Sequence, residues 1–310
     1  MREAPLHAHS TRPRLAVTLG DVRGIGPEIV ARALASEELR ALCDFVVVGP
    51  TGAGIEVAEA IGDWRAEGGG RADEAHAGRL AGLAVERAVA LAMGGAVQGI
   101  VTAPLDKAAL LAGGYTDPGH TEMLARLTGS RVAMMLASDR LRVVLATTHL
   151  PLRDVPTALT AKSIGIAAEV TREYLVRWFG IAEPRIALCA LNPHAGDGGR
   201  FGTEDDDLLR PAARASGIAG PFPADTVFVR AIRGEFDAVI APYHDVGMTA
   251  IKVASFGSAV NVTLGLPFPR TSPDHGTALD IAGRGVADPS SFVAAVHLCA
   301  SIASRATVAA

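Results

Sequence analysis

Short apolar runs alternate with amphipathic stretches along most of the chain. Each run is too short for an ordinary helix and is rich in apolar residues, so it predicts a buried strand. Between the runs, apolar residues recur at helical spacing, for example at Leu80, Ala84, Ala88 and Leu91. Strands that alternate with helices in this way are typical of the α/β class with a largely parallel sheet. The predicted strands occupy residues 15–19, 45–48, 99–102, 141–147, 185–191 and 238–241.

A glycine-containing turn follows the first predicted strand. It reads Gly24-Ile25-Gly26-Pro27-Glu28, and Pro27 with Glu28 suits the first turn of a helix that we predict to about Leu42. The spacing of the glycines matches neither the dinucleotide-binding fingerprint of Rossmann folds nor a P-loop. The turn is therefore compatible with a ligand-binding role and equally with a purely structural one.

The composition indicates a globular protein with a substantial interior and no large charged face. The chain has 310 residues, of which 49% are hydrophobic and 20% are charged, so we expect one large or two modest domains. A net charge of −4 gives no basic surface for nucleic acid. No apolar run reaches the roughly 18 residues that a membrane span needs, so we expect no membrane association.

The cysteines and the amino terminus indicate the compartment. Cys43, Cys189 and Cys299 lie far apart in the sequence, which predicts neither a disulfide framework nor a cysteine metal site. We therefore expect a reducing, cytoplasmic environment. Residues 1–13 lack the apolar centre of a signal peptide, and we interpret them as a flexible extension.

The stretch from Ala241 to Gly285 concentrates the candidate chemistry. It carries histidines, acids, a lysine and an arginine among glycines and short apolar runs, and burying such side chains unpaired would cost several kcal/mol each. Within it, His244 and Asp245 follow a predicted strand, and Asp274 to Ala278 contains a glycine that lets the backbone approach a ligand. We interpret the stretch as a binding site; the alternative is a polar loop with one structural histidine.

Three histidines each follow an apolar run: His149, His194 and His244. Parallel strands of one sheet end at the same edge, so the three side chains can converge on one ion. Neutral imidazole is the commonest metal ligand, and three nitrogens with an open position are typical of a catalytic metal site. The alternative is that one or two of them are hydrogen-bonded core histidines.

Two further positions carry polar groups at predicted helix starts. His120 and Thr121 stand side by side after a glycine; helix capping explains the threonine but not the histidine. Lys107 follows the strand at residues 99–102, where it is a candidate anion contact or a solvated lysine.

From about Leu15 to Phe292 the chain resembles the 4-hydroxythreonine-4-phosphate dehydrogenase family of pyridoxal phosphate biosynthesis. The resemblance implies a two-domain α/β/α fold like that of the isocitrate and isopropylmalate dehydrogenases, which lack the Rossmann fingerprint. It also implies a homodimer with shared active sites. The motifs that carry it occur in the order TLGDVRGIGPEI, VTAPLDKAAL, GHTEML, TTHLPLRDV, LNPHAGDGGRFGTED, PADT, YHDVG and VNVTLGLPFPRTSPDHGTALDIAGRG.

On this resemblance we expect a first domain at residues 14–129 and 280–310, a second at 130–279, and the active site in the cleft between them. The implied metal ligands are His149 and His194 of one chain with His244 of the other. Catalytic roles are implied for His120, Thr121, Asp225 and Asp245. The implied substrate contacts are His120, Thr121, Lys252, Asn261 and Arg270. The implied contacts to NAD or NADP are His275, Gly276, Thr277, Ala278 and Asp280.

The implied reaction is oxidation of 4-phosphooxythreonine by NAD or NADP with one divalent ion (Zn, Mg or Co). The β-keto acid product would decarboxylate to 3-amino-2-oxopropyl phosphate. Arg23 departs from the usual Gly-Asp-Pro-Ala-Gly motif, and Asp106 stands where asparagine is common. These departures leave threonate or erythronate 4-phosphate as alternative substrates. A phosphate acyltransferase is the alternative from another class; the three histidines and the loop at His275 argue against it.

Overall fold

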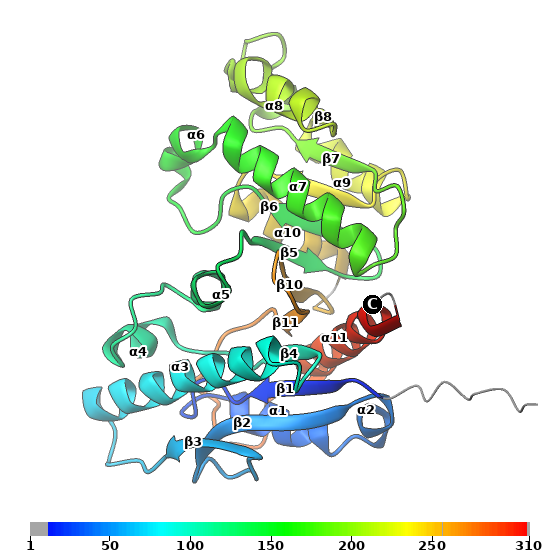
Figure 1. Cartoon of the computed structure of the whole chain (residues 1–310). Coiled ribbons are helices and arrows are strands. Elements are labelled where there is room, and N and C mark those ends of the chain that lie inside the picture. The colour runs from blue at the N-terminus through cyan, green and yellow to red at the C-terminus, as the bar shows by residue number, and fades with distance from the viewer. Residues whose placement is uncertain (1–11, 256, 309–310) are drawn as a thin grey trace, which may run out of the picture.

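Eleven strands of the described residues form one continuous sheet through the centre of the molecule (Figure 1). The computed structural model describes residues 12–255 and 257–308. Along the sheet the strands follow the order β3-β2-β1-β4-β11-β10-β5-β6-β9-β7-β8. Their bounds are β1 (Arg14–Thr18), β2 (Asp44–Thr51), β3 (Glu59–Asp63), β4 (Gly99–Thr102), β5 (Ala133–Ala137), β6 (Arg142–Leu145), β7 (Ile186–Cys189), β8 (Ala219–Phe222), β9 (Ala238–Ala241), β10 (Val260–Leu264) and β11 (Arg270–Pro273).

Most neighbouring strands are parallel, as the alternating pattern predicts, so the α/β class is confirmed. The exceptions lie in the middle, where β10 is antiparallel to both β11 and β5, and β5 is antiparallel to β6. The neighbours β6, β9 and β7 are mutually parallel. Their carboxyl ends therefore lie at one edge of the sheet, and the three predicted ligand histidines follow these ends.

Helices cover both faces of the sheet (Figure 1). The longest connecting helices are amphipathic, and α7 begins with a capping box in which the side chains of Thr160 and Ser163 bond each other's backbone N–H. The helices are α1 (Gly26–Leu34), α2 (Glu37–Leu42), α3 (Arg71–Met93), α4 (Lys107–Ala112), α5 (His120–Thr128), α6 (Val155–Ala158), α7 (Ala161–Arg177), α8 (Arg210–Ala215), α9 (Ala224–Ile232), α10 (His244–Ser255) and α11 (Ser290–Val308), with short turns η1 (Leu152–Asp154), η2 (Pro193–Gly196) and η3 (Asp205–Leu209).

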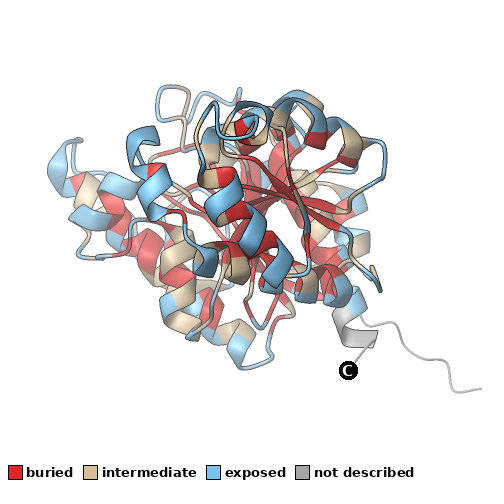
Figure 2. Ribbon diagram, turned by 90° about the horizontal axis from the view of Figure 1, so that it is seen from above, coloured by how far each residue is buried: buried red, intermediate tan, exposed pale blue. Residues whose placement is uncertain are grey.

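The apolar core is continuous on one face of the sheet and divided on the other. Buried strands fill the centre of the molecule, and the outer sides of the helices are exposed (Figure 2). On the continuous face, Val17 and Phe292 belong to the same cluster as Trp178 and Ile240. On the opposite face, a cluster around Ile100 is separate from the cluster around Val239. The interruption leaves room for a cavity above the central strands.

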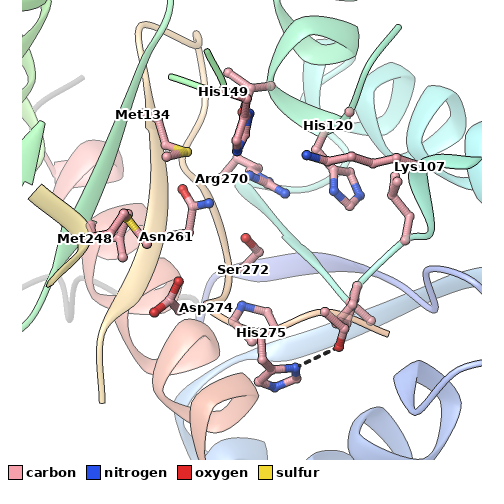
Figure 3. Close-up of a pocket in the computed structure, with 18 of the residues that line it drawn as sticks. Lys107, His120, Met134, His149, Met248, Asn261, Arg270, Ser272, Asp274 and His275 are labelled. Carbon is pink, nitrogen blue, oxygen red and sulfur yellow. Dashed lines mark hydrogen bonds between the residues drawn. The ribbon is translucent and has the colours of Figure 1, made fainter. Parts of the chain in front are cut away.

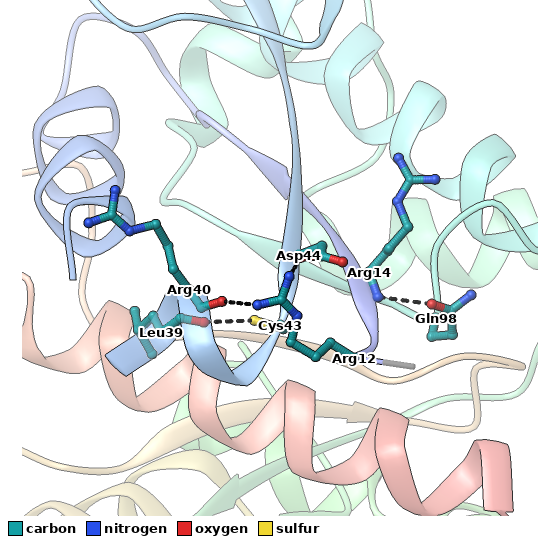
Figure 4. Close-up of polar contacts among 7 residues, drawn as sticks. All are labelled: Arg12, Arg14, Leu39, Arg40, Cys43, Asp44 and Gln98. Atoms are coloured by element: carbon teal, nitrogen blue, oxygen red, sulfur yellow. Dashed lines mark hydrogen bonds and ion pairs between the residues drawn. The ribbon is translucent and has the colours of Figure 1, made fainter. Parts of the chain in front are cut away.

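Polar contacts fix the residues just before β1 against the fold. Arg12 donates hydrogen bonds to the carbonyl of Arg40 at 2.8 Å and to the Asp44 carboxylate at 2.7 Å (Figure 4). The Pro13 carbonyl accepts from the backbone N–H of Asp44. Arg12 and Pro13 therefore contact the fold, although the sequence places them in a flexible extension; the rest of that extension lies outside the described residues.

The two halves of the sheet are joined by the central antiparallel strands. β11 pairs with β4 and β10 pairs with β5, so the last third of the chain contributes to both halves. The boundaries at residues 129 and 279 stay a prediction, because the sheet continues across them. Within the described residues, no helix has the length and apolar character needed to cross a lipid bilayer.

Candidate active site

A cavity of about 440 Å³ lies on the divided face of the sheet (Figure 3). Three strands form its floor, on which Asn261 is the cross-strand partner of both Leu136 and Ser272. Arg270 lies two residues before Ser272 on β11 and therefore points to the same side. The loop after β4, the first turn of α5 and one side of α10 line it as well. Both halves of the sheet thus line this cavity.

The side chain of Arg270 is a buried cation on the cavity floor. It is 1% exposed, and its guanidinium donates to the Thr263 hydroxyl at 3.0 Å and to the Thr102 hydroxyl at 2.6 Å. Its Nε has no hydrogen-bond partner, and no carboxylate pairs with it, among the described residues. Burial lowers the pKa of Arg270 to about 10, so it is still charged at neutral pH. A buried, unpaired cation of this kind requires an anion from outside the chain.

Two more polar atoms of the cavity lack partners among the described residues: Nε2 of His120 and Oδ1 of Asn261, both buried. Burial lowers the pKa of His120 well below its usual value, and the positive charges of Arg270 and Lys107 lower it further. His120 is therefore a neutral imidazole in the free protein. Figure 3 shows His120, Asn261 and Arg270 pointing toward a common space. Together they offer a charge and hydrogen-bonding groups to one polar ligand.

Lysines and acids also line the cavity. Lys252 on α10 pairs with Asp274 at 3.3 Å. Burial raises the pKa of Asp274, and the neighbouring Lys252 partly offsets this shift. Lys107, Thr121 and Glu122 line the same cavity. The predicted substrate contacts His120, Thr121, Lys252, Asn261 and Arg270 all line it too.

His149 and His244 lie side by side at the mouth of the cavity. Their ring centroids are 5.4 Å apart, and both side chains line it. The Asp245 carboxylate lies 2.7 Å from Nδ1 of His244, which leaves Nε2 as the ring nitrogen available to a metal. Partial burial lowers the pKa of His149, as do the nearby Lys107 and His244. The pair fits a divalent metal, with positions open for further ligands.

The structure does not bring His194 to this pair. His194 is exposed, its ring packs near Phe201 at 6.3 Å, and its backbone is left-handed with φ 54°. No group of three histidine, cysteine or acidic side chains of the described chain is arranged to hold a metal. Convergence of the three histidines within one chain is therefore wrong. The turn after β7 directs His194 into solvent, although it follows a strand parallel to β6 and β9.

The two predicted acids differ in position. Asp245 contacts His244, one of the two predicted ligands that lie side by side. Asp225 is exposed in the first turn of α9 and lines none of the cavities described here. A catalytic role for Asp225 stays a prediction.

The loop from His275 to Asp280 connects the cavity to the first glycine turn. His275 and Gly276 line the cavity, and the Thr277 carbonyl accepts from the backbone N–H of Ile25 at 2.9 Å. A side chain at Gly24 would come within 2.7 Å of that carbonyl, so the close approach requires glycine. Ala278 has φ 43°, and Asp280 is exposed.

A second cavity of about 470 Å³ lies beyond this loop. Arg23, Gly24 and Glu28 line it on one side, and Gly283 and Gly285 on the other. Asp21, which is fully buried, holds the Arg23 guanidinium at 2.7 Å. A Cβ at Gly276 would meet open space, so the backbone there is open to a ligand.

Sequence reasoning missed several cavity residues. Met134 and Leu136 come from β5, which was not among the predicted strands, Ser272 comes from β11, which lacks an apolar run, and Met248 comes from α10. The unbroken apolar run at residues 133–137 is the signal that would have identified β5 as part of the floor.

Comparison with known proteins gives one consistent answer. A family profile described as "Pyridoxal phosphate biosynthetic protein PdxA" matches residues 54–299. A 4-hydroxythreonine-4-phosphate dehydrogenase of Stenotrophomonas maltophilia (strain R551-3) is 43% identical over 326 residues, which cover 96% of this chain and 100% of that protein. The crystal structure of such a dehydrogenase from Klebsiella pneumoniae is 38% identical, with a TM-score of 0.82 over 96% of this chain and 99% of that one.

A more distant structure bears on the fold alone. An isocitrate dehydrogenase from Methylococcus capsulatus is 15% identical, with a TM-score of 0.50 over 94% of this chain and 88% of that one. This similarity confirms the predicted relation to the isocitrate dehydrogenase fold. The family profile and the full-length relatives together show that the chain belongs to the PdxA family of 4-hydroxythreonine-4-phosphate dehydrogenases, oxidoreductases that act on a CH–OH group.

Proposed function

We propose that this protein oxidises the secondary hydroxyl of 4-phosphooxythreonine with NAD or NADP. The β-keto acid then loses carbon dioxide to give 3-amino-2-oxopropyl phosphate. The observation that carries the proposal is the buried Arg270 guanidinium, which has no anionic partner among the described residues and faces the cavity. The names of the relatives support a phosphorylated hydroxy acid as the matching anion.

We propose that Arg270 and its neighbours hold the phosphate group of the substrate. The guanidinium still has donors that neither Thr263 nor Thr102 uses, and charge-assisted hydrogen bonds to phosphate are strong. His120 and Asn261 each offer one unpaired atom to the same ligand. Thr121 and Lys252 line the cavity beside them and orient the rest of the substrate.

His149 and His244 are the proposed metal ligands of one chain. We infer a homodimer in which the partner's His194 supplies the third nitrogen, because His194 does not reach the pair in its own chain. This division differs from the one implied by the resemblance, which groups His149 with His194. A divalent ion such as Zn²⁺, Mg²⁺ or Co²⁺ would polarise the substrate hydroxyl and stabilise negative charge on that oxygen during loss of carbon dioxide.

The loop from His275 to Ala278, with Asp280, is the proposed dinucleotide contact. Its contact with the first glycine turn, and the presence of a cavity lined by His275 and Gly276 and of another lined by Gly24, support this proposal. NAD or NADP supplies the hydride acceptor, while the loop sets its position. Three buried free cysteines, Cys43, Cys189 and Cys299, support a reducing, cytoplasmic compartment.

A substrate panel tests this function. Reduction of the nicotinamide is followed by absorbance with 4-phosphooxythreonine, threonate 4-phosphate, erythronate 4-phosphate and unphosphorylated 4-hydroxythreonine. We expect the highest kcat/KM with 4-phosphooxythreonine and a loss of roughly a hundredfold without the phosphate. A higher kcat/KM with threonate or erythronate 4-phosphate would reassign the substrate. No reduction with any compound, together with acyl transfer to phosphate, would identify an acyltransferase instead.

A further inference from the structure

A third cavity lies behind the active-site cavity, across the same two strands. Leu136 and Asn261 face the active site, whereas their neighbours Ala137 and Val260 face this cavity of about 730 Å³. Successive side chains of a strand point to opposite faces, so the two cavities lie back to back on β5 and β10. None of the proposed substrate, metal or cofactor residues lines it.

The carboxyl end of α7 and helix α11, which pack on different halves of the sheet, both line this rear cavity. The end of α7 and the last turns of α11 lie on the same side of the molecule (Figure 1), and Arg305 of α11 donates to the Phe179 carbonyl at 2.9 Å. Trp178, which is 1% exposed, and Ile302 form an apolar wall. The Ser301 hydroxyl also lines the cavity. Because of the apolar wall, the cavity suits a ligand with an apolar body.

Arg142 gives the rear cavity a cationic wall. Its Nε is buried without a hydrogen-bond partner, and no carboxylate is within ion-pairing distance of its guanidinium, among the described residues. One Nη donates weakly to the Asp237 carbonyl at 3.3 Å, and the guanidinium lies 4.9 Å from the centre of the Phe179 ring. Burial lowers the pKa of Arg142, while Asp237 and the exposed Asp139 at the cavity counteract this.

The other basic side chains of the cavity are engaged elsewhere. His297 pairs with Glu38 at 3.3 Å, and Arg305 bonds the Phe179 carbonyl. Among the described residues that line this cavity, Arg142 is thus the cation whose buried Nε donor has no partner. One such cation beside an acidic residue, Asp139, favours a single negative charge over a phosphate dianion.

We propose that the rear cavity binds a small amphipathic monoanion, an aromatic or aliphatic body that carries one carboxylate or sulfonate. The anionic group pairs with Arg142, and the apolar body packs against Trp178 and Ile302. Such a ligand would contact β5 and β10 from the side opposite the substrate.

Anilinonaphthalene sulfonate, an aromatic monoanion, is the probe for this test. Its fluorescence is titrated with the full-length protein, and excitation of tryptophan reports its proximity to Trp178. We expect Arg142→Gln to weaken probe binding by roughly tenfold to a hundredfold, since a charge-assisted hydrogen bond is lost. Ser301→Trp, at an exposed helix position, should block the cavity and weaken binding similarly. Arg131→Gln, an exposed arginine paired with Glu169 outside the cavity, is the matched control and should bind as wild type.

Thermal melting of each variant shows whether it folds. Unchanged probe affinity in a folded Arg142→Gln or Ser301→Trp variant would overturn the proposal. Competition between the probe and NAD or substrate would also overturn it, because the probe would then occupy the active site. If Arg142→Gln does not fold, the Ser301→Trp result decides.

Discussion

Mixed dimers of His194→Ala and His244→Ala chains should regain about a quarter of wild-type activity, although each variant alone should be inactive. In such a dimer one site receives both lesions. The other combines intact His149 and His244 of one chain with intact His194 of its partner. Random exchange makes about half of the dimers mixed, and one of their two sites works, which gives about one quarter on symmetry grounds.

The matched control is the mixture of His149→Ala with His244→Ala. These two histidines lie in ring contact within one chain, so each site of the mixed dimer lacks one of them and no activity should return. Recovery in this control would show that His149 and His244 come from different chains. Absence of recovery in both mixtures, once differently tagged chains confirm exchange, would contradict a shared site. Loss of bound metal by elemental analysis should accompany each single variant.

Arg270→Gln should lower kcat/KM for the phosphorylated substrate by roughly tenfold to a hundredfold, which corresponds to about 1.5–3 kcal/mol for a charge-assisted hydrogen bond. The residual turnover of the unphosphorylated analogue should change far less. This difference separates anion recognition from a structural role, because a distorted cavity would impair both substrates. Inhibition by inorganic phosphate should weaken in parallel.

Two controls keep the Arg270 result interpretable. Arg65→Gln alters an exposed arginine paired with Asp63 at the far edge of the sheet, and it should leave both substrates unaffected. Thermal melting of Arg270→Gln reports the loss of its bonds to Thr263 and Thr102. Equal losses on both substrates in a folded variant would show that Arg270 does not bind the phosphate.

The sequence pattern predicts the parallel strands that carry long apolar runs, but it misses the edge strands β3 and β8 and the central strands β5, β10 and β11. β1, β4 and β9 match apolar runs almost residue for residue, and the predicted stripe at Leu80, Ala84 and Ala88 is buried on α3. β11 reads Arg-Thr-Ser-Pro, which carries no apolar signal, because its hydrogen-bonding and buried environment come from distant strands. Tertiary pairing overrides local propensity at such positions.

The site shows the same division between local and tertiary information. His149 and His244 were identifiable because each follows a strand, yet the exposure of His194 depends on a left-handed turn that the pattern does not reveal. The chemistry of Arg270 is visible in the sequence only as a charged residue near glycines. Its burial without a counter-ion among the described residues, which makes it informative, arises from packing among β4, β10 and β11.

If one cavity oxidises and then decarboxylates a phosphorylated hydroxy acid with help from a metal, reduced nicotinamide and carbon dioxide must appear together. The most direct measurement quantifies both in the same reaction with 4-phosphooxythreonine. We expect equal amounts of the two, both abolished by a chelator and both restored by a divalent ion. Nicotinamide reduction without carbon dioxide, or full turnover by chelated, metal-free protein, would contradict this expectation.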